Sequence, residues 1–374
     1  MDIVVKKSLF RSSFAAVAAI APSRTTKVAW SMVLCEVDSG RIKLTATDGT
    51  VVMIEEITDC EIRKGGICLL PADRIASILK ESQSDDIRIV QNGTSLTVSA
   101  GSDKFTLQTV DPETFPTVEM PDTGYFEVSA EHLQNIIKRV PVACGEASAS
   151  FALKSIFIEY EPQDDGRQEH LQFVAVDGKR MAVYSAPTKH VPGKSNSITT
   201  GLIQKEHFQR IGALATADVV QIANNGNAFF FRCGNRKMSI QQTEGRFPKW
   251  QKILPSKAGR DAFDTSAATL LSAVRRASIA CEVESRALSL NFAADKATIS
   301  AETASVGNSL IEIPINFSGE PITNLIVDSK LLNDLLSSVG DSDVSISLNG
   351  TTEAVLLNEG EHFVAVVMPC GKGD

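Results

Sequence analysis

Apolar side chains recur along this chain at two spacings, one typical of helices and one typical of strands. Near the start, Phe10, Phe14, Val17 and Ala21 fall at i, i+4, i+7 and i+11, which predicts an amphipathic helix over residues 8–20. Further segments have the same helical period. They are residues 74–81, 130–140, 205–214, 266–280 and 330–339.

Between these helices apolar positions alternate with polar ones, and three of the alternating pairs flank an Asn-Gly dipeptide. The dipeptides are Asn92-Gly93, Asn225-Gly226 and Asn349-Gly350, separated by 133 and 124 residues. Asn-Gly provides the positive φ angles of a two-residue type I′ turn, so each predicts a β-hairpin. Because a helix precedes each hairpin and another begins each period, we expect three copies of one α+β domain, each with two helices packed on antiparallel sheets.

The length of 374 residues gives about 125 residues for each copy, a normal domain size. Clusters of Pro, Gly and Lys at 121–124 and 255–259 predict domains at residues 1–122, 123–256 and 257–374. With 43% apolar and 22% charged residues, the composition is that of a soluble globular protein and excludes a disordered or collagen-like chain.

The first helix has an alternative interpretation. Lys6, Lys7 and Arg11 precede an apolar run at 14–21 and superficially resemble a signal peptide. The amphipathic spacing and the repeat favour the helix, and the run is too short to span a bilayer. We therefore expect a cytoplasmic protein without membrane association. Seven scattered cysteines and five dispersed histidines, without a C-x-x-C or H-E-x-x-H motif, predict reduced thiols, no metal and no cofactor.

Catalytic motifs are absent from the sequence: no Walker A loop, no G-x-G-x-x-G after a strand and no G-x-S-x-G. Asp48, Asp177 and Glu302 occupy corresponding places in the three copies. They could form a hydrolase site if they converged in space. A repeated carboxylate next to Gly is more simply a turn or capping residue, and we expect no enzymatic activity.

The distribution of charge along the chain leads to a different expectation from the net charge alone. A net charge of −8 argues against a nucleic-acid partner, but the six helical segments carry +6, which leaves −14 on the rest of the chain. Basic helices on an acidic body suit a surface that faces phosphates. Ordinary solvation of helices by Lys and Arg is the alternative.

Four strings of residues resemble the bacterial DNA sliding clamps, the beta subunits of DNA polymerase III. They are Leu44-Thr45-Ala46-Thr47-Asp48, the run from Val174 to Val183, Glu244-Gly245-Arg246-Phe247-Pro248 and Val366-Val367-Met368-Pro369. The resemblance covers the whole chain. It implies a head-to-tail homodimeric ring of six domains around duplex DNA, which slides without sequence specificity. It also implies partners that carry a clamp-binding peptide: the replicative polymerase, the clamp loader and repair proteins. A repeat-built peptide-binding scaffold that does not encircle DNA is the competing hypothesis.

The resemblance and the helix positions give candidate residues for DNA and for the ring interface. Arg24 matches the exposed loop arginine with which the family touches DNA. Helix position alone adds Lys7, Arg11, Arg74, Lys80, Lys138, Arg139, Lys205, Arg210, Arg275 and Arg276. The ring interface implied by the family joins one edge, Arg74, Phe105 and Leu107, to another, Ile279 and Glu302.

The family also implies a pocket between the second and third domains, which accepts a peptide resembling Gln-Leu-x-Leu-Phe. Its matched residues are Leu153, Val176, Gly178, Lys179, Arg180, Met181, Pro248, Lys252, Ile253, Val366, Met368 and Pro369. Val176, Lys252 and Cys370 replace the family's usual Thr, Arg and Met, and the tail continues over residues 371–374. These changes affect peptide preference. The segment 302–308 lacks a run of glutamates, so we expect weaker electrostatic support for ring closure.

Overall fold

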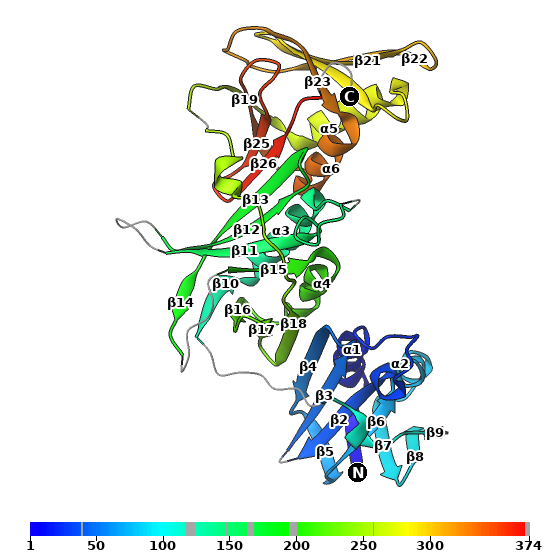
Figure 1. Ribbon diagram of the computed structural model, residues 1–374. Helices are drawn as coiled ribbons and strands as arrows, with labels where there is room; N and C mark the ends of the chain where they lie inside the picture. Colours follow the sequence, from blue (N-terminus) through cyan, green and yellow to red (C-terminus); the bar gives the residue numbers. More distant parts are fainter. Residues whose placement is uncertain are drawn as a thin grey trace. The chain divides into compact units, whose positions relative to one another are not determined.

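The computed structural model describes residues 1–38, 40–116, 124–146, 148–162, 168–193, 200–256 and 258–370, and one order of elements recurs in it three times (Figure 1). Each repeat has a strand, a helix, a run of strands, a second helix and three final strands. The helices are α1 (Lys7–Ala18), α2 (Ala72–Glu81), α3 (Ala130–Arg139), α4 (Lys205–Gln209), α5 (Ala267–Ala277) and α6 (Ser329–Val339). The predicted repeat and its six helices are confirmed, although the short strand before each first helix was missed.

Short 3₁₀ helices extend or connect these elements. They are η1 (Val28–Ser31), η2 (Pro112–Thr114), η3 (Pro141–Ala143), η4 (Arg210–Leu214), η5 (Trp250–Lys252) and η6 (Ser278–Ala280). The predicted helix over 205–214 is therefore one α-helical turn, α4, followed by η4. The predicted helix over 266–280 likewise consists of α5 followed by η6.

The packing of the chain forms two units, and the first holds a five-stranded and a nine-stranded sheet. This unit comprises the described residues of Met1–Ala130, His190–Ile198 and Arg210–Gln242. The order of the five-stranded sheet is β5 (Cys60–Lys64), β1 (Asp2–Lys6), β7 (Asp86–Asn92), β8 (Ser95–Ala100) and β9 (Asp103–Gln108). The order of the nine-stranded sheet is β14 (Lys189–Val191), β10 (Tyr125–Ser129), β16 (Val219–Asn224), β17 (Ala228–Cys233), β18 (Arg236–Gln241), β4 (Val51–Ile57), β3 (Arg41–Thr47), β2 (Met32–Asp38) and β6 (Gly66–Pro71).

The second unit holds an eight-stranded and a four-stranded sheet. It comprises the described residues of Glu131–Lys189, Thr199–Gln209 and Thr243–Asp374. The order of the eight-stranded sheet is β15 (Thr200–Gln204), β11 (Ser155–Glu161), β12 (His170–Val176), β13 (Arg180–Pro187), β26 (Phe363–Val367), β25 (Val355–Glu359), β24 (Asp343–Leu348) and β19 (Asp261–Ser266). The order of the four-stranded sheet is β22 (Gly307–Pro314), β21 (Lys296–Thr303), β20 (Ala287–Phe292) and β23 (Ile322–Asp328).

Two of the sheets continue from one repeat into the next. In the first unit β18 of the second repeat pairs antiparallel with β4 of the first, and Met238 lies opposite Met53. In the second unit β13 of the second repeat pairs antiparallel with β26 of the third, and Ala182 lies opposite Ala365. Corresponding strands form both junctions. β18 and β26 are the last strands of their repeats, and β4 and β13 are the third strands after the first helix of theirs.

The amphipathic pattern of the first helix places its apolar side chains in the core, as predicted. Phe10, Phe14 and Val17 of α1 are fully buried, and α1 packs on β3, β4 and α2. The rings of Phe10 and Phe14 stack at 5.7 Å between centroids. In the second unit α5 and α6 also pack against each other, and Leu270 and Val274 of α5 and Leu332, Leu335 and Leu336 of α6 are buried.

The three predicted hairpins are present, but the predicted type I′ turn is wrong. Gly93, Gly226 and Gly350 have positive φ, whereas none of the preceding asparagines does. The first hairpin retains a two-residue loop, since Asn92 pairs with Ser95. The loops of the other two hairpins, residues 225–227 and 349–354, are longer.

Candidate functional site

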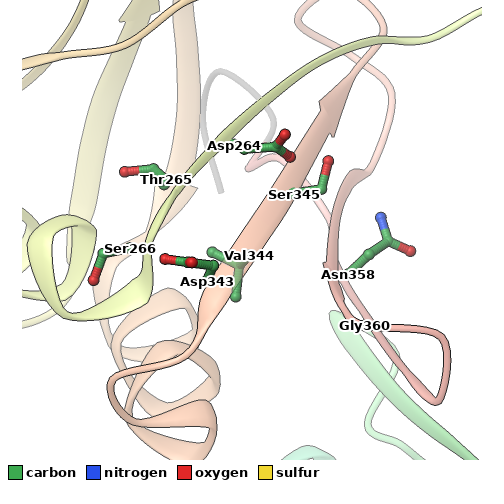
Figure 2. Close-up of a pocket in the computed structure, with 8 residues that line it drawn as sticks. All are labelled: Asp264, Thr265, Ser266, Asp343, Val344, Ser345, Asn358 and Gly360. Carbon is green, nitrogen blue, oxygen red and sulfur yellow. The ribbon is translucent and has the colours of Figure 1, made fainter.

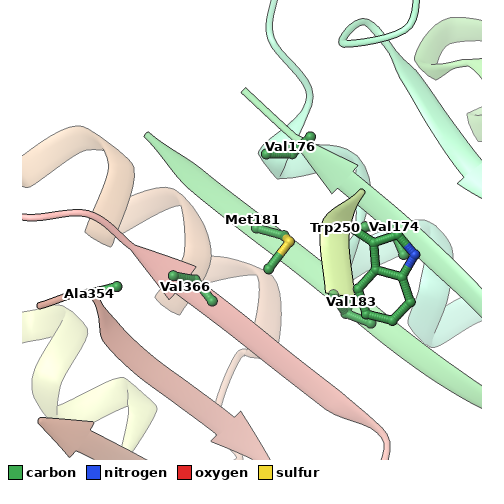
Figure 3. Close-up of a cluster of buried hydrophobic side chains, with 7 residues drawn as sticks. All are labelled: Val174, Val176, Met181, Val183, Trp250, Ala354 and Val366. Carbon is green, nitrogen blue, oxygen red and sulfur yellow. The ribbon is translucent and has the colours of Figure 1, made fainter. Parts of the chain in front are cut away.

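An apolar cluster lies on one face of the junction between β13 and β26, in the second unit (Figure 3). Val176 of β12 lies opposite Met181 of β13, which lies opposite Val366 of β26. Alternate residues of a strand point to the same face, so Val174 and Val183 form a second row on this face. Trp250, Ala354 and these five residues are buried together, and in Figure 3 Met181 lies between Val366 and Trp250.

Partly buried side chains surround this cluster. Leu153, Phe157, Phe247, Leu254 and Val364 pack against it. The rings of Phe157 and Phe247 stack at 4.8 Å between centroids. The buried residues of the cluster therefore form an apolar floor, and the partly buried side chains form an apolar rim around it.

The indole of Trp250 is fixed at this cluster by one acidic side chain. Its Nε1 donates a hydrogen bond of 3.0 Å to Glu159, which also accepts one of 2.8 Å from Gln251. Two residues with exposed side chains, Ile253 and Met368, lie beside this cluster. The N–H of Ile253 donates to the carbonyl of Trp250, and the N–H of Met368 donates to the carbonyl of Lys179.

The structure divides the twelve predicted pocket residues into three groups. Leu153, Val176, Met181 and Val366 belong to the cluster. Gly178, Lys179, Lys252, Ile253 and Met368 are exposed, and Pro248 and Pro369 are half-buried. Arg180 points elsewhere: its guanidinium is buried, with ion pairs of 3.0 Å to both Asp177 and Asp334.

Arg180 belongs instead to a charged hollow of about 460 Å³ in the second unit. Lys138, Lys205 and Lys330 line it together with Glu146 and Asp334. Lys205 pairs with Glu146 at 2.6 Å and Lys330 pairs with Asp334 at 3.1 Å. Two predicted DNA contacts, Lys138 and Lys205, are thus brought together here.

The remaining predicted DNA contacts differ in how available their charges are. Arg11, Arg24, Arg74, Lys80, Arg275 and Arg276 are exposed. Lys7 donates to the carbonyl of Ser82 at 3.0 Å, and Arg210 forms an ion pair with Asp48. Arg139 is buried and bonded to Glu359, so its charge is used inside the second unit.

The predicted interface residues lie at or near two free sheet edges. Phe105 and Leu107 are on β9, the edge strand of the five-stranded sheet, and Phe105 is exposed. Ile279 in η6 is 77% exposed. Glu302 lies on β21, one strand inside the edge, while β22 is the edge itself and carries Leu310, which is 67% exposed.

Two of the three repeated carboxylates, Asp48 and Asp177, are turn residues, which was the simpler interpretation, whereas Glu302 lies within strand β21 opposite Asn308. One oxygen of Asp48 accepts the N–H groups of Thr50 and Val51 at 2.9 and 2.8 Å. Asp177 does the same for Lys179 and Arg180, at 2.9 Å each. Burial raises the pKa of Asp48, but those backbone hydrogen bonds and Arg210 outweigh it, so the pKa lies below its usual value.

A second hollow in the second unit, of about 550 Å³, has a polar lining (Figure 2). Asp264, Ser345 and Asn358 lie side by side across β19, β24 and β25, and Asp343 lies further along β24. Among the described residues, no group of three or more His, Cys, Asp or Glu could hold a metal ion, and no helix is long and apolar enough to cross a membrane. All seven cysteines lie in the described part of the chain and are thiols that form no disulfide there, as predicted.

Comparison with known proteins agrees with the fold. Two family models match, the N-terminal domain of the DNA polymerase III beta subunit over residues 1–121 and its C-terminal domain over residues 251–370. Together they match well over half of the chain. The chain belongs to the DNA polymerase III beta-subunit family.

Relatives within this family match over nearly the full length. The beta sliding clamp of Pseudomonas aeruginosa is 23% identical over 99% of both chains, and that of Pseudomonas putida is 24% identical over the same share. Crystal structures of the clamps from Pseudomonas aeruginosa and Bacillus subtilis have TM-scores of 0.87 and 0.88, with 22% and 18% identity. They cover 99% of this chain, and this chain covers 100% and 99% of them.

Membership of the clamp family confirms the predicted function at the level of the family. The chain is a sliding clamp, a non-enzymatic processivity factor that works with DNA and DNA polymerase III in DNA replication. The sequence reasoning missed Trp250, Leu310 and Lys330. Trp250 follows the Phe247-Pro248 string by two residues, and Leu310 is an apolar residue in an alternating strand, so local signals existed for both.

Proposed function

We propose that two copies of this chain close head to tail into a ring, and the free sheet edges carry this proposal. The chain contains two junctions of one kind, β18 with β4 and β26 with β13. The corresponding strand at the end of the first repeat is β9, and the corresponding strand in the third repeat is β22. Each is an edge strand of its own sheet. Pairing β9 of one copy with β22 of the next completes the same junction and forms a nine-stranded sheet from five and four strands.

The chemistry of these two edges fits that pairing. An unpaired edge strand offers a row of free N–H and C=O groups, which proteins usually protect with charges. Here β9 exposes Phe105 and β22 exposes Leu310, next to the exposed Ile279. Arg74 and Glu302 are exposed as well and supply opposite charges. Apolar contact therefore contributes more than ion pairing to closure.

The test uses Phe105→Glu and Leu310→Glu, with Val283→Glu as the control because Val283 is also exposed in the second unit. Light scattering gives the mass of a dimer for the natural chain and for the control, and of a monomer for the two edge variants. Retention on nicked circular but not linear DNA reports encirclement. A natural chain that stays monomeric at micromolar concentration refutes the ring and leaves the scaffold hypothesis.

Duplex DNA in such a ring faces the basic helices. The exposed cations Arg11, Arg24, Arg275 and Arg276 are available for phosphates, and a closed ring needs no sequence readout. Reversing Arg275 and Arg276 to Glu is expected to shorten polymerase extension without dissociating the dimer. Unchanged extension lengths would count against these helices as the DNA-facing surface.

The second part of the proposal is that the apolar cluster around Met181 and Trp250 receives the clamp-binding peptide of the polymerase, the clamp loader and repair proteins. Support comes from its chemistry: an aliphatic and aromatic floor with an adaptable Met, and the exposed side chains of Ile253 and Met368 beside it. A clamp from Pseudomonas aeruginosa and one from Bartonella birtlesii were solved bound to griselimycin, and we expect this chain to bind it too.

Ile253→Glu with Met368→Glu tests the peptide site, because both side chains are exposed and the changes do not disturb the core. Calorimetry with the pentapeptide Gln-Leu-Ser-Leu-Phe is expected to lose its signal, while retention on circular DNA persists. Retained affinity would contradict the assignment. The three domains at residues 1–122, 123–256 and 257–374 and the cytoplasmic location complete the proposal.

A further inference from the structure

A hollow of about 560 Å³ lies on the nine-stranded sheet of the first unit and shares no lining residue with the sites described above. Its floor is formed by Leu34 of β2, Thr45 of β3 and Ile67 of β6. Phe115 and Pro116, which follow η2, form one wall. Its volume is within the range of sites that hold small ligands, and its lining combines the apolar Leu34, Ile67, Pro112, Phe115 and Pro116 with the polar Glu36, Lys43, Thr45 and Glu113.

Strand register places this hollow at the position of one side of the apolar cluster in the second repeat, the side formed by Phe157 and Val174. Leu34 lies opposite Thr45 in the first repeat, and Phe157 lies opposite Val174 in the second. β2 and β3 correspond to β11 and β12, so this part of the floor is shared by the two repeats, whereas β4 and β18, the counterparts of β13 and β26, do not line the hollow.

The wall of the hollow repeats too. Phe115-Pro116 closes the first repeat as Phe247-Pro248 closes the second. Phe115 packs against Leu69, and Phe247 stacks on Phe157. Both repeats therefore bring a Phe-Pro pair back over the same face of the sheet.

One of the residues that line the hollow, Thr45, has a polar atom without a partner among the described residues. The hydroxyl oxygen of Thr45 is buried, with the residue 2% exposed, and it has no hydrogen-bond partner among the described residues. Val174 takes its place in the second repeat. A buried hydroxyl without a partner is unfavourable, and the N–H or C=O group of a bound backbone removes that penalty.

We propose that this hollow is a second docking site for the same class of short apolar peptide, one that binds more weakly than the cluster of the second unit. Leu34, Ile67 and Phe115 receive an apolar anchor, and Thr45 bonds the peptide backbone. The proposal rests on the peptide site proposed above, through the correspondence of the repeats. Glu36 and Lys43 pair at 2.8 Å, and Glu113 leaves the lining with one net negative charge, so it disfavours an acidic anchor.

The experiment uses the full-length chain and the pentapeptide Gln-Leu-Ser-Leu-Phe with a photoreactive benzophenone at its N-terminus. Crosslinked residues are located by mass spectrometry in the natural chain, in Ile67→Glu and in Val28→Glu. Ile67 and Val28 are 52% and 56% exposed, so the two variants change similar side chains inside and outside the hollow. We expect crosslinks in both units, and a loss of about tenfold or more in the first unit for Ile67→Glu alone.

Thr45→Val provides a second measurement that does not depend on a charge in the hollow. The variant keeps the shape of the side chain and removes the unpartnered hydroxyl, so thermal stability should stay the same or rise. Crosslinking in the first unit should fall several-fold, because the peptide loses its hydrogen bond. Unchanged crosslinking would overturn the role of Thr45.

The outcomes separate this inference from the proposed function. Crosslinks confined to the second unit overturn the second site and leave the first standing. An absence of crosslinks in both units overturns both. Crosslinks in the first unit that Ile67→Glu does not weaken show that the peptide binds outside the hollow and also overturn the inference.

Discussion

The ion pair between Arg139 and Glu359 should stabilise the fold and not bind DNA. Arg139 lies on α3 in the second repeat, and Glu359 ends β25 in the third. Nε and Nη2 of Arg139 donate to the two carboxylate oxygens at 2.5 and 2.6 Å, and Nη1 donates to Asn135 at 2.6 Å. The side chains are only 9% and 15% exposed. We therefore expect Glu359→Gln to destabilise the second unit.

The size of the effect follows from this geometry. Removing one partner of a buried ion pair costs about 3–5 kcal/mol, because the other charge is left buried without compensation. Gln keeps one oxygen that can accept from Arg139, so we expect a loss of about 3 kcal/mol. The double variant Arg139→Met with Glu359→Met should lose less than either single change, since no charge remains buried.

Urea unfolding measures this difference. With a slope of about 2 kcal/mol per molar urea, the midpoint of Glu359→Gln should fall by about 1.5 M at pH 7. Burial raises the pKa of Glu359, but hydrogen bonds from Arg139 and Ser342 outweigh it and hold the pKa below the usual 4.5. The carboxylate therefore stabilises the fold above pH 4.5, and this contribution is lost as the pH falls through the folded-state pKa.

The same variants separate a structural role from a DNA-binding role. Arg139→Met in the folded state should leave retention on circular DNA unchanged, because its guanidinium faces Glu359 and not solvent. Arg275→Met is the matched control, since Arg275 is exposed on α5. An Arg139 variant with normal stability and weakened DNA retention would refute the reasoning.

The structure also predicts the outcomes of two substitutions and of one alkylation experiment. Gly49→Ala should lower the free energy of unfolding by about 2 kcal/mol or more in thermal denaturation, because Gly49 has a φ of 94° and a new Cβ would lie 2.6 Å from the Trp30 ring. Burial and then the nearby His362 lower the pKa of His132. As the pH falls, His132 is therefore protonated at a higher pH in the unfolded chain than in the folded chain. The free energy of unfolding should decrease as the pH falls below about 6.5, and His132→Gln should make it less dependent on pH in that range. Burial raises the pKa of the Cys144 thiol to about 12, so alkylation at pH 8 should require unfolding.

Local sequence patterns predicted the elements well because their signals are local. The spacing of Phe10, Phe14 and Val17 gave the buried face of α1. The Asn-Gly pairs gave the hairpins but not their turn type. In the second hairpin the side chain of Asn225 accepts the N–H groups of Asn227 and Ala228 at 3.0 Å each, which favours a longer turn than the one predicted.

The pairing of strands between repeats could not be predicted in this way. β9 and β18 have equivalent places in their repeats, yet one is an edge and the other an interior strand. Residues distant in the sequence decide the difference. The same holds for Arg139, whose position on a helix suggested DNA, while its partner Glu359 is 220 residues away.

The junctions inside the chain and the proposed junction between copies should differ in strength. Between β18 and β4, the buried Glu55 accepts a hydrogen bond of 2.8 Å from Arg236, and Lys237 pairs with Glu56 at 3.0 Å. The edges β9 and β22 present Phe105 and Leu310 instead, and the chain connects neither edge to another copy. Opening the ring at β9 and β22 therefore exposes apolar surface without separating a buried ion pair. We expect the ring to open there and the internal junctions to stay closed, so that hydrogen exchange is faster in β9 and β22 than in β4 and β18.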